Sequence, residues 1–208
     1  MKHKLSTILL CACCLLSCNT TKFVPQGQLL LNDVKVKVED NKNIPPSDLM
    51  KYVQQKPNTE ILGFWKLQLD IYNTASEDTT KWTSKNARKI GEPPVIFSSE
   101  LTDASQAQLQ RAMQNKGYFN AEIDTTVAVK KRKINLVYHV TANEPYMIGQ
   151  YNVELEHNEL AAIANNQRRL ITGGSQFDAE VLNQERQRVA SAMRRRGYFY
   201  FDQELLCY

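Results

Sequence analysis

The chain has 208 residues and a formal net charge of +4, a length that allows one or two domains. This nearly balanced charge gives no reason to expect nucleic acid or an acidic substrate as a partner. The sequence has no P-loop, GxGxxG loop, GxSxG elbow or HExxH pair, and its histidines show no metal-ligand spacing. We therefore expect no enzyme, no cofactor and no metal site.

Residues 1–17 have the pattern of a secretory signal peptide. Lys2 and Lys4 make the start basic, and residues 5–16 form a largely apolar run that is shorter than the roughly 20 residues needed to span a bilayer. A small residue then precedes Cys18, which resembles the lipobox of bacterial lipoproteins. In such signals the cysteine is acylated and becomes the first mature residue, so we expect a lipid anchor on Cys18.

Processing at Cys18 would decide the cysteine chemistry of the mature chain. Cys11, Cys13 and Cys14 would leave with the signal peptide, so Cys207 would remain as a thiol and no internal disulfide is expected. The leader carries two lysines and no acid, so 24 basic and 22 acidic side chains would remain, for a charge of +2. Residues 18–28 are expected to form a short lipidated tether.

Residues 29–142 are predicted to form a first α+β domain. Its opening strand is indicated by valines that alternate with charged residues over 34–39. Ser47 is expected to cap a short helix that follows Pro45-Pro46. Residues from about 54 to 99 are irregular in pattern, and we interpret them as an ordered insertion with one short strand or helix.

The second half of this domain is predicted to be a helix followed by a hairpin. The helix is expected from about residue 102 to 116, and Gly117 ends it as a C-cap glycine. Alternating apolar residues over 123–129 and 134–140 predict two paired strands. The basic run Lys130-Lys131-Arg132-Lys133 between them is either an anion site or, as is more common for such runs, a solvated turn.

Residues 145–208 are predicted to begin the same arrangement again as a second domain. Alternation over 151–155 indicates a strand, and Asp178 is expected to cap a helix that ends at Gly197. Residue 208 precedes the expected hairpin, so the second domain is predicted to be truncated.

An internal repeat supports this two-domain interpretation. Residues 112–119 read Ala-Met-Gln-Asn-Lys-Gly-Tyr-Phe and residues 192–199 read Ala-Met-Arg-Arg-Arg-Gly-Tyr-Phe, identical at five of eight positions with an offset of 80. The opening strands match at an offset of 117, and the difference of 37 is about the length of the insertion. We therefore expect one β-α-α-β-β unit to occur twice. Glycine at positive φ followed by an aromatic pair is read as architectural, and the residues concerned are Gly117, Tyr118, Phe119, Gly197, Tyr198 and Phe199.

The order of these features resembles the POTRA domains of outer-membrane assembly proteins. The closer resemblance is to the BamA/TamA-like lipoproteins of Bacteroidetes, often called TamL. Besides the lipobox and the two Gly-Tyr-Phe motifs, the matching pieces are Thr21-Lys22-Phe23-Val24-Pro25-Gln26-Gly27, Gln55-Lys56-Pro57-Asn58, Gly91-Glu92-Pro93-Pro94-Val95 and Glu144-Pro145-Tyr146. The resemblance implies tandem POTRA-like units, here without the C-terminal β-barrel of such proteins.

The resemblance also implies a function. It suggests a periplasmic scaffold whose exposed sheet edges bind extended segments of outer-membrane protein clients or assembly-machinery subunits by β-augmentation. No acidic run follows Cys18, so we expect a lipid-anchored protein of the bacterial outer membrane with its domains facing the periplasm. Two alternatives remain open: a stand-alone structural envelope lipoprotein that tethers partner proteins, and a hydrolase whose site has no sequence signature.

Overall fold

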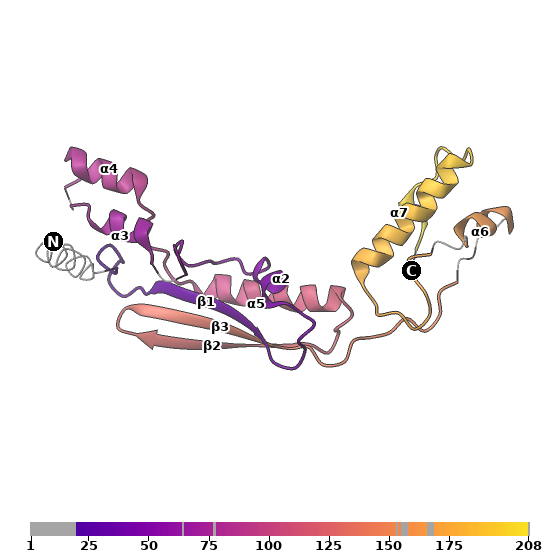
Figure 1. Cartoon of the computed structure of the whole chain (residues 1–208), viewed down its shortest axis with the longest axis horizontal. Helices are drawn as coiled ribbons and strands as arrows, with labels where there is room; N and C mark the ends of the chain where they lie inside the picture. The colour runs from indigo at the N-terminus through magenta and orange to yellow at the C-terminus, as the bar shows by residue number, and fades with distance from the viewer. Residues whose placement is uncertain are drawn as a thin grey trace, which may run out of the picture. The chain divides into compact units, whose positions relative to one another are not determined.

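The computed structural model describes residues 20–63, 65–76, 78–152, 154, 158–165 and 169–207 (Figure 1). The predicted signal peptide and Cys18 lie outside these residues. The chain divides into two compact units. One contains the chain up to Lys37 with Val53–Gln106 and Asp124–His139, and the other contains Val38–Tyr52, Ala107–Ile123 and Val140–Tyr208. None of the described helices has both the length and the apolar character needed to cross a bilayer.

The fold is α+β, as predicted, and its sheet has three strands in the order β1-β3-β2. Strand β1 spans Leu30–Val38, β2 spans Glu122–Lys130 and β3 spans Lys133–Thr141. The Leu30 amide donates to the Arg132 carbonyl at 2.9 Å, and the Glu39 amide donates to the Val140 carbonyl at 3.0 Å, so β1 and β3 run parallel. Parallel neighbours need a crossover, which the helices between β1 and β2 provide.

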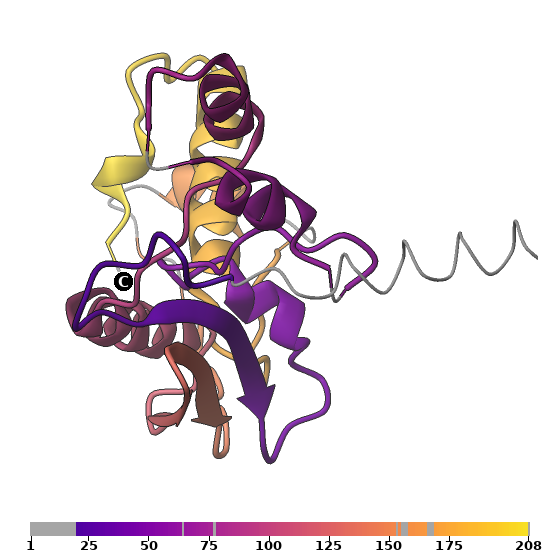
Figure 2. The same ribbon diagram turned by 90° about the vertical axis from the view of Figure 1, so that its left-hand side faces the viewer.

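One face of the sheet is buried because its apolar residues recur with a period of two. In β1, Val34 and Val36 are buried, while Lys35 and Lys37 are exposed. In β3 the buried residues are Ile134, Leu136, Tyr138 and Val140. Figure 2, turned by 90° from Figure 1, shows helix α5 (Ser99–Asn115) beside the sheet.

Helix α5 begins three residues before its predicted start. The Ser98 hydroxyl accepts a hydrogen bond from the Leu101 amide at 3.3 Å, which satisfies one amide of the first turn and extends the helix. Along the helix Leu109 and Met113 are fully buried. The helical region predicted from apolar spacing is thus confirmed, and a local cap adds its first turn.

Two predictions in the segment between β1 and α5 were wrong. Helix α2 spans Pro46–Met50 with Pro45 at its N-cap, so Ser47 lies inside the first turn and caps nothing. Proline suits the first helical position, held by Pro46, because its φ is already helical and its missing amide hydrogen is not needed there. The insertion holds two helices rather than one element, α3 (Leu67–Asn73) and α4 (Trp82–Ile90).

The described part of the predicted tether packs against the first unit. Lys22 Nζ donates to the carbonyls of Asn73 (3.1 Å) and Ala75 (2.6 Å), and Phe23 makes an edge-to-face contact with Tyr72 at 5.5 Å. Val24 is buried with Leu30 and Leu69 in a small cluster. Residues 22–24 therefore pack against the first unit and are not free chain.

The chain beyond Thr141 contains helices α6 (Asn158–Ala164) and α7 (Ala179–Arg195) and a short 3-10 helix, η2 (Gln203–Leu205). Asp178 caps α7 as predicted, since its carboxylate accepts from the Glu180 amide at 2.8 Å. The helices share a small core, with Ala164, Val189 and Met193 fully buried.

The strand predicted over 151–155 is absent at Tyr151, Asn152 and Glu154, and the other two residues lie outside the described part. A strand needs a neighbour to pair its backbone groups. In the described residues after β3, the β pairing is the isolated bridge between Met147 and Gln176.

A buried ion pair ties α7 to the preceding loop. The Arg188 guanidinium donates to both oxygens of Glu185, each at 2.7 Å, and also to the Ala164 carbonyl at 2.7 Å. The Leu170 amide and the Tyr151 hydroxyl donate to the same carboxylate. Burial favours protonation of Glu185, but these donors outweigh it and hold the pKa of the carboxyl below its ordinary value.

Candidate functional site

The two edges of the sheet differ in what covers them. Along the outer edge of β1 runs an edge strip, residues 93–97. The Leu31 amide donates to the Val95 carbonyl at 2.8 Å, and the Phe97 amide donates to the Leu29 carbonyl at 2.9 Å. Strand β2 forms the opposite edge of the three-stranded sheet and has β3 on one side. The edge of β2 is therefore the candidate site for an added strand.

Two side-chain amides hold the edge strip against β1. Asn58, 1% exposed, donates from Nδ2 to the Pro93 carbonyl at 2.8 Å and accepts from the Val95 amide at 3.1 Å. Gln55 donates to the Ile96 carbonyl and accepts from the Ser98 amide at 3.1 Å. Buried amides with both ends paired fix the strip in place, because each broken bond would leave a buried polar group unsatisfied.

The hairpin turn decides which amides of β2 face outward. The turn residues Lys131 and Arg132 join Lys130 to Lys133, so the two flanking residues are paired. Antiparallel pairing alternates, so the even-numbered residues of β2 point their amides toward β3. The amides of Thr125, Val127 and Val129 therefore point away from the sheet.

Apolar side chains accompany these outward amides. Val127 is 45% exposed and Val129 is 57% exposed, although they share a sheet face with the buried Ile123. An extended peptide added to this edge would gain main-chain hydrogen bonds and apolar contact together, which are the two sources of affinity in β-augmentation.

Both glycines that were predicted to end helices have a left-handed backbone. Gly117 has φ +89° and Gly197 has φ +99°. Tyr118 donates its amide to the Met113 carbonyl and Gly117 donates to the Gln114 carbonyl, and the same pair of bonds recurs 80 residues later. This is the Schellman arrangement, in which a left-handed glycine lets two amides satisfy the last carbonyls of a helix.

The first Gly-Tyr-Phe motif docks a following segment. The Tyr146 amide donates to the Gly117 carbonyl at 2.8 Å, and the Phe177 amide donates to the Tyr146 carbonyl at 2.9 Å. The Phe119 ring lies 5.1 Å from the ring of Tyr146 and 5.2 Å from that of Phe177. Tyr118 is buried and its hydroxyl accepts from Asn41 at 3.2 Å.

The second motif has the same backbone turn but an exposed surface. Tyr198 is 42% exposed and Phe199 is 77% exposed, and an added Cβ on Gly197 would meet nothing within 4 Å. Cys18, the predicted lipidation site, lies outside the described residues. Among the described residues, the predicted site residues therefore lie in two separate turns, one at residues 117–119 and one at residues 197–199.

Arg132 in the basic hairpin turn has a role that sequence reasoning missed. Its guanidinium donates to the carbonyls of Val24 (2.6 Å) and Pro25 (2.7 Å), which anchors residues 21–25 to the hairpin. Lys130 and Lys131 are exposed. The run is thus solvated at Lys130 and Lys131, as the more common case predicted, whereas Arg132 holds residues 21–25 in place.

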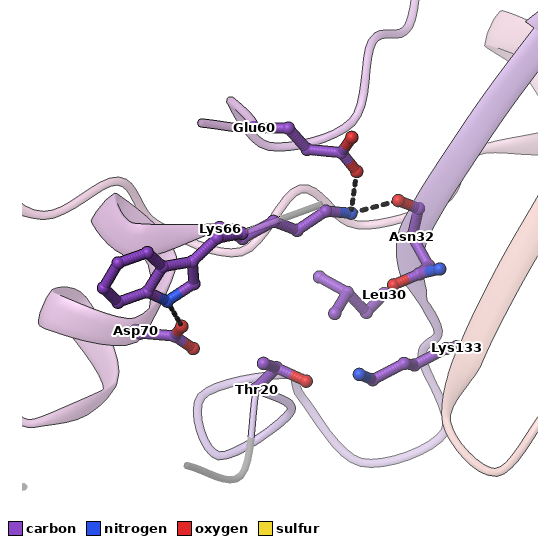
Figure 3. Close-up of a pocket in the computed structure, with 8 residues that line it drawn as sticks. Thr20, Leu30, Asn32, Glu60, Lys66, Asp70 and Lys133 are labelled. Atoms are coloured by element: carbon purple, nitrogen blue, oxygen red, sulfur yellow. Dashed lines mark hydrogen bonds and ion pairs between the residues drawn. The ribbon is translucent and has the colours of Figure 1, made fainter. Parts of the chain in front are cut away.

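A small cavity of about 210 Å³ lies at the start of β1 (Figure 3). Lys66 reaches across it, donates to the Asn32 carbonyl and lies 3.6 Å from Glu60 Oε1. Burial lowers the pKa of the Lys66 ammonium, and the charge of Glu60 opposes that shift. Because Lys66 is already paired within the protein, we assign it the structural role of fastening the insertion to β1.

No convergent set of three metal-ligating side chains occurs among the described residues. The candidate binding surfaces of the described residues are the β2 edge and the exposed Gly-Tyr-Phe turn at residues 197–199.

Comparison with known proteins identifies the family of the chain. The model of the POTRA family, described as surface antigen variable number repeat, matches residues 34–143. These are 110 of the 208 residues. The chain belongs to the POTRA family. The matched region contains β2, β3 and the first Gly-Tyr-Phe motif, and the second motif lies outside it.

Among solved structures, the chain is similar to the crystal structure of Haemophilus influenzae BamA POTRA3-5. The identity is 10%, the match covers 86% of this chain and 90% of that chain, and the TM-score is 0.28. No curated protein sequence matches the chain significantly. The family assignment thus rests on the POTRA model.

Proposed function

We propose that this POTRA protein is the periplasmic scaffold portion of an outer-membrane protein assembly or translocation factor of the TamL-like kind. It acts by binding extended client or partner segments along the edge of β2. The observation that carries this proposal is the contrast between the two sheet edges. The edge strip covers the start of β1 through main-chain hydrogen bonds, while β2 presents outward amides beside two exposed valines.

The chemistry of β-augmentation suits a scaffold with many clients. Main-chain hydrogen bonds do not depend on the client's side chains, and the pleat brings alternate side chains against the exposed valines. Strands of outer-membrane proteins alternate between apolar and polar residues, so every second side chain of such a strand would meet Val127 or Val129. No catalytic group is required, and the protein is proposed to be non-enzymatic.

The test is amide hydrogen exchange with and without a nine-residue peptide of alternating apolar and polar residues. We expect slower exchange at Thr125, Val127 and Val129, and no change at the amides of β2 that already pair with β3. Val127→Pro should abolish the effect, because proline lacks the outward amide and is tolerated on a strand edge.

The matched control is Val127→Thr, which keeps the amide and the β-branched shape. Equal protection in the proline variant, or protection confined to the outer edge of β1, would show that β2 is not the binding edge. If the protein were still found in the envelope but no amide of β2 were protected by the peptide, the alternative of a structural lipoprotein that tethers partner proteins would be favoured.

The proposed scaffold is anchored by a lipid on Cys18, with its domains in the periplasm. The lipobox after a basic and apolar leader supports this anchor. Mass spectrometry should find diacylglycerol on Cys18 at the mature N-terminus, and Cys18→Ala should yield an unprocessed or soluble form. Protease treatment of intact cells should leave the domains uncut, and rapid digestion would place them on the cell surface instead.

The proposed division of the chain follows the repeat. Residues 29–142 form the first POTRA-like domain with its insertion at about 54–99, and residues 145–208 form part of a second. The equal Schellman turns at Gly117 and Gly197 support this division. Limited proteolysis should release fragments cut near residues 142–145, and cleavage within the first domain before that junction would contradict it.

A further inference from the structure

The two Gly-Tyr-Phe motifs have one backbone geometry and two different surroundings. Besides the Schellman bonds, the Ala121 amide donates to the Tyr118 carbonyl in the first copy, and the Phe201 amide donates to the Tyr198 carbonyl in the second. The correspondence therefore extends through the turn that follows each motif. What differs is coverage, since Tyr118 is 6% exposed and Tyr198 is 42% exposed.

The first copy shows what such a turn binds. Tyr146 places its amide on the Gly117 carbonyl and its ring on Phe119. The Phe177 backbone lies where a side chain of residue 117 would be, because an added Cβ would come within 2.5 Å of the Phe177 carbonyl oxygen. The missing side chain of Gly117 thus makes room for an extended segment, in addition to permitting the helix cap.

The second copy has the same vacant glycine surface and a groove beside it. The groove, about 420 Å³, is lined by Gly197, Tyr198, Phe199, Tyr200, Phe201 and Leu205. Phe199 and Tyr200 are strongly exposed there. Contiguous exposed aromatic residues of this kind mark interaction sites.

The charge beside the groove differs from that of the first copy. Gln114 and Asn115 of the first helix are replaced by Arg194 and Arg195, both exposed in the last turn of α7. A cationic last turn favours an acidic residue in the segment that binds. In the first copy, the docked Tyr146 follows Glu144-Pro145, so the segment bound there carries an acid two residues before its aromatic.

We propose that the groove at Gly197 is a docking site for an extended segment of a partner protein, and that this segment carries one acidic and one aromatic residue. The segment donates an amide to the Gly197 carbonyl, stacks an aromatic ring on Phe199 and places its acidic residue near Arg194 and Arg195. The site is separate from the β2 edge, so the docking proposal can be correct or wrong independently of the proposed client-binding function.

The test uses the intact chain and a peptide with the sequence of residues 143–149, Asn-Glu-Pro-Tyr-Met-Ile-Gly. Titration followed by amide NMR should give saturable shifts at Gly197, Phe199 and Phe201. The amides of Gly117 and Phe119 should stay unchanged, because that turn is already occupied. Replacing the peptide's tyrosine by alanine should weaken binding about tenfold, the loss expected for one aromatic contact.

Variants of the chain separate docking from folding. Phe199→Ala should weaken binding about tenfold without altering stability, since the ring is exposed. Gly197→Ala should abolish binding by filling the space at the glycine. Gly174→Ala is the matched control, because Gly174 also has positive φ (+83°) and open space around it but does not line the groove.

Three results would overturn the proposal. The peptide would give no saturable shift at the groove, or it would bind Phe199→Ala as well as the wild type. Alternatively, phosphatidylglycerol vesicles would perturb Phe199 and Tyr200 while the peptide does not, which would make the groove a membrane contact.

Discussion

Substituting the two C-cap glycines separates helix capping from docking. Gly117→Ala and Gly197→Ala both force alanine to a φ near +90°, at a cost of about 1–2 kcal/mol. At Gly117 the new Cβ would also lie 2.5 Å from the Phe177 carbonyl oxygen, whereas Gly197 has open space. Displacing the docked segment would break the Tyr146–Gly117 hydrogen bond, at about 1 kcal/mol. It would also loosen two ring contacts, at about 0.5–1.5 kcal/mol each.

We therefore expect Gly117→Ala to destabilise the chain by about 3–6 kcal/mol and Gly197→Ala by about 1–2 kcal/mol. For a chain of this size each kcal/mol lowers the melting temperature by roughly 2–4 °C. Urea unfolding followed by circular dichroism would measure both, and hydrogen exchange would report the Tyr146 amide. Equal destabilisation of the two variants, with the Tyr146 amide still protected in Gly117→Ala, would refute the argument that Gly117 makes room for docking.

Three further predictions concern contacts found in the structure. Arg188→Ala should destabilise the region around α7 by about 3–5 kcal/mol, because it leaves Glu185 buried without its partner. Since the pKa of Glu185 is lowered in the folded chain, its stabilisation is present above its ordinary pKa of 4.5 and is lost as pH falls through the lower folded value. Acid titration of unfolding should show this loss in the wild type, and an unchanged acid profile in Arg188→Ala would contradict it. Arg132→Ala should speed hydrogen exchange in residues 21–25, while Lys130→Ala should not; equal effects would mean that the carbonyl contacts of Arg132 do not hold that loop. Asn58→Ala should cost about 1–3 kcal/mol and loosen the edge strip from β1, and protection of the Leu31 amide that survives this substitution would show that the strip is held by other contacts.

Local patterns along the chain predicted the main elements of the first domain. The alternating valines of β1, the apolar spacing of α5 and the two alternating runs of the hairpin each determine local structure through their own period. Gly117 and Gly197 were identified as left-handed caps because the backbone requirement is local and glycine meets it best. The Asp178 cap was predicted for the same reason, since its partners lie two and three residues away.

The errors share a different cause. Ser47 lost the cap position to Pro45. The insertion was predicted to hold one short strand or helix and holds two helices, of which α3 packs its Leu69 in the cluster with Val24 and Leu30. In both cases neighbouring groups outside the pattern decided the outcome. The strand predicted over 151–155 lacked a paired neighbour in the described residues, and strand pairing cannot be read from one segment alone.

By itself, the sequence determined the α+β class, the position of each C-cap glycine and the repeat that relates residues 112–119 to 192–199. Only the tertiary structure showed that the motif pieces bind one another, as Asn58 does with residues 93–95 and Tyr146 with Gly117. It also showed that, among the described residues, a strip of chain pairs with the outer edge of β1 and none pairs with the outer edge of β2. It showed as well that the Gly-Tyr-Phe turn at 117–119 is occupied while the one at 197–199 is exposed. The physical reason is range: caps and periods depend on residues a few positions apart, while edge coverage and docking depend on groups that only folding brings together.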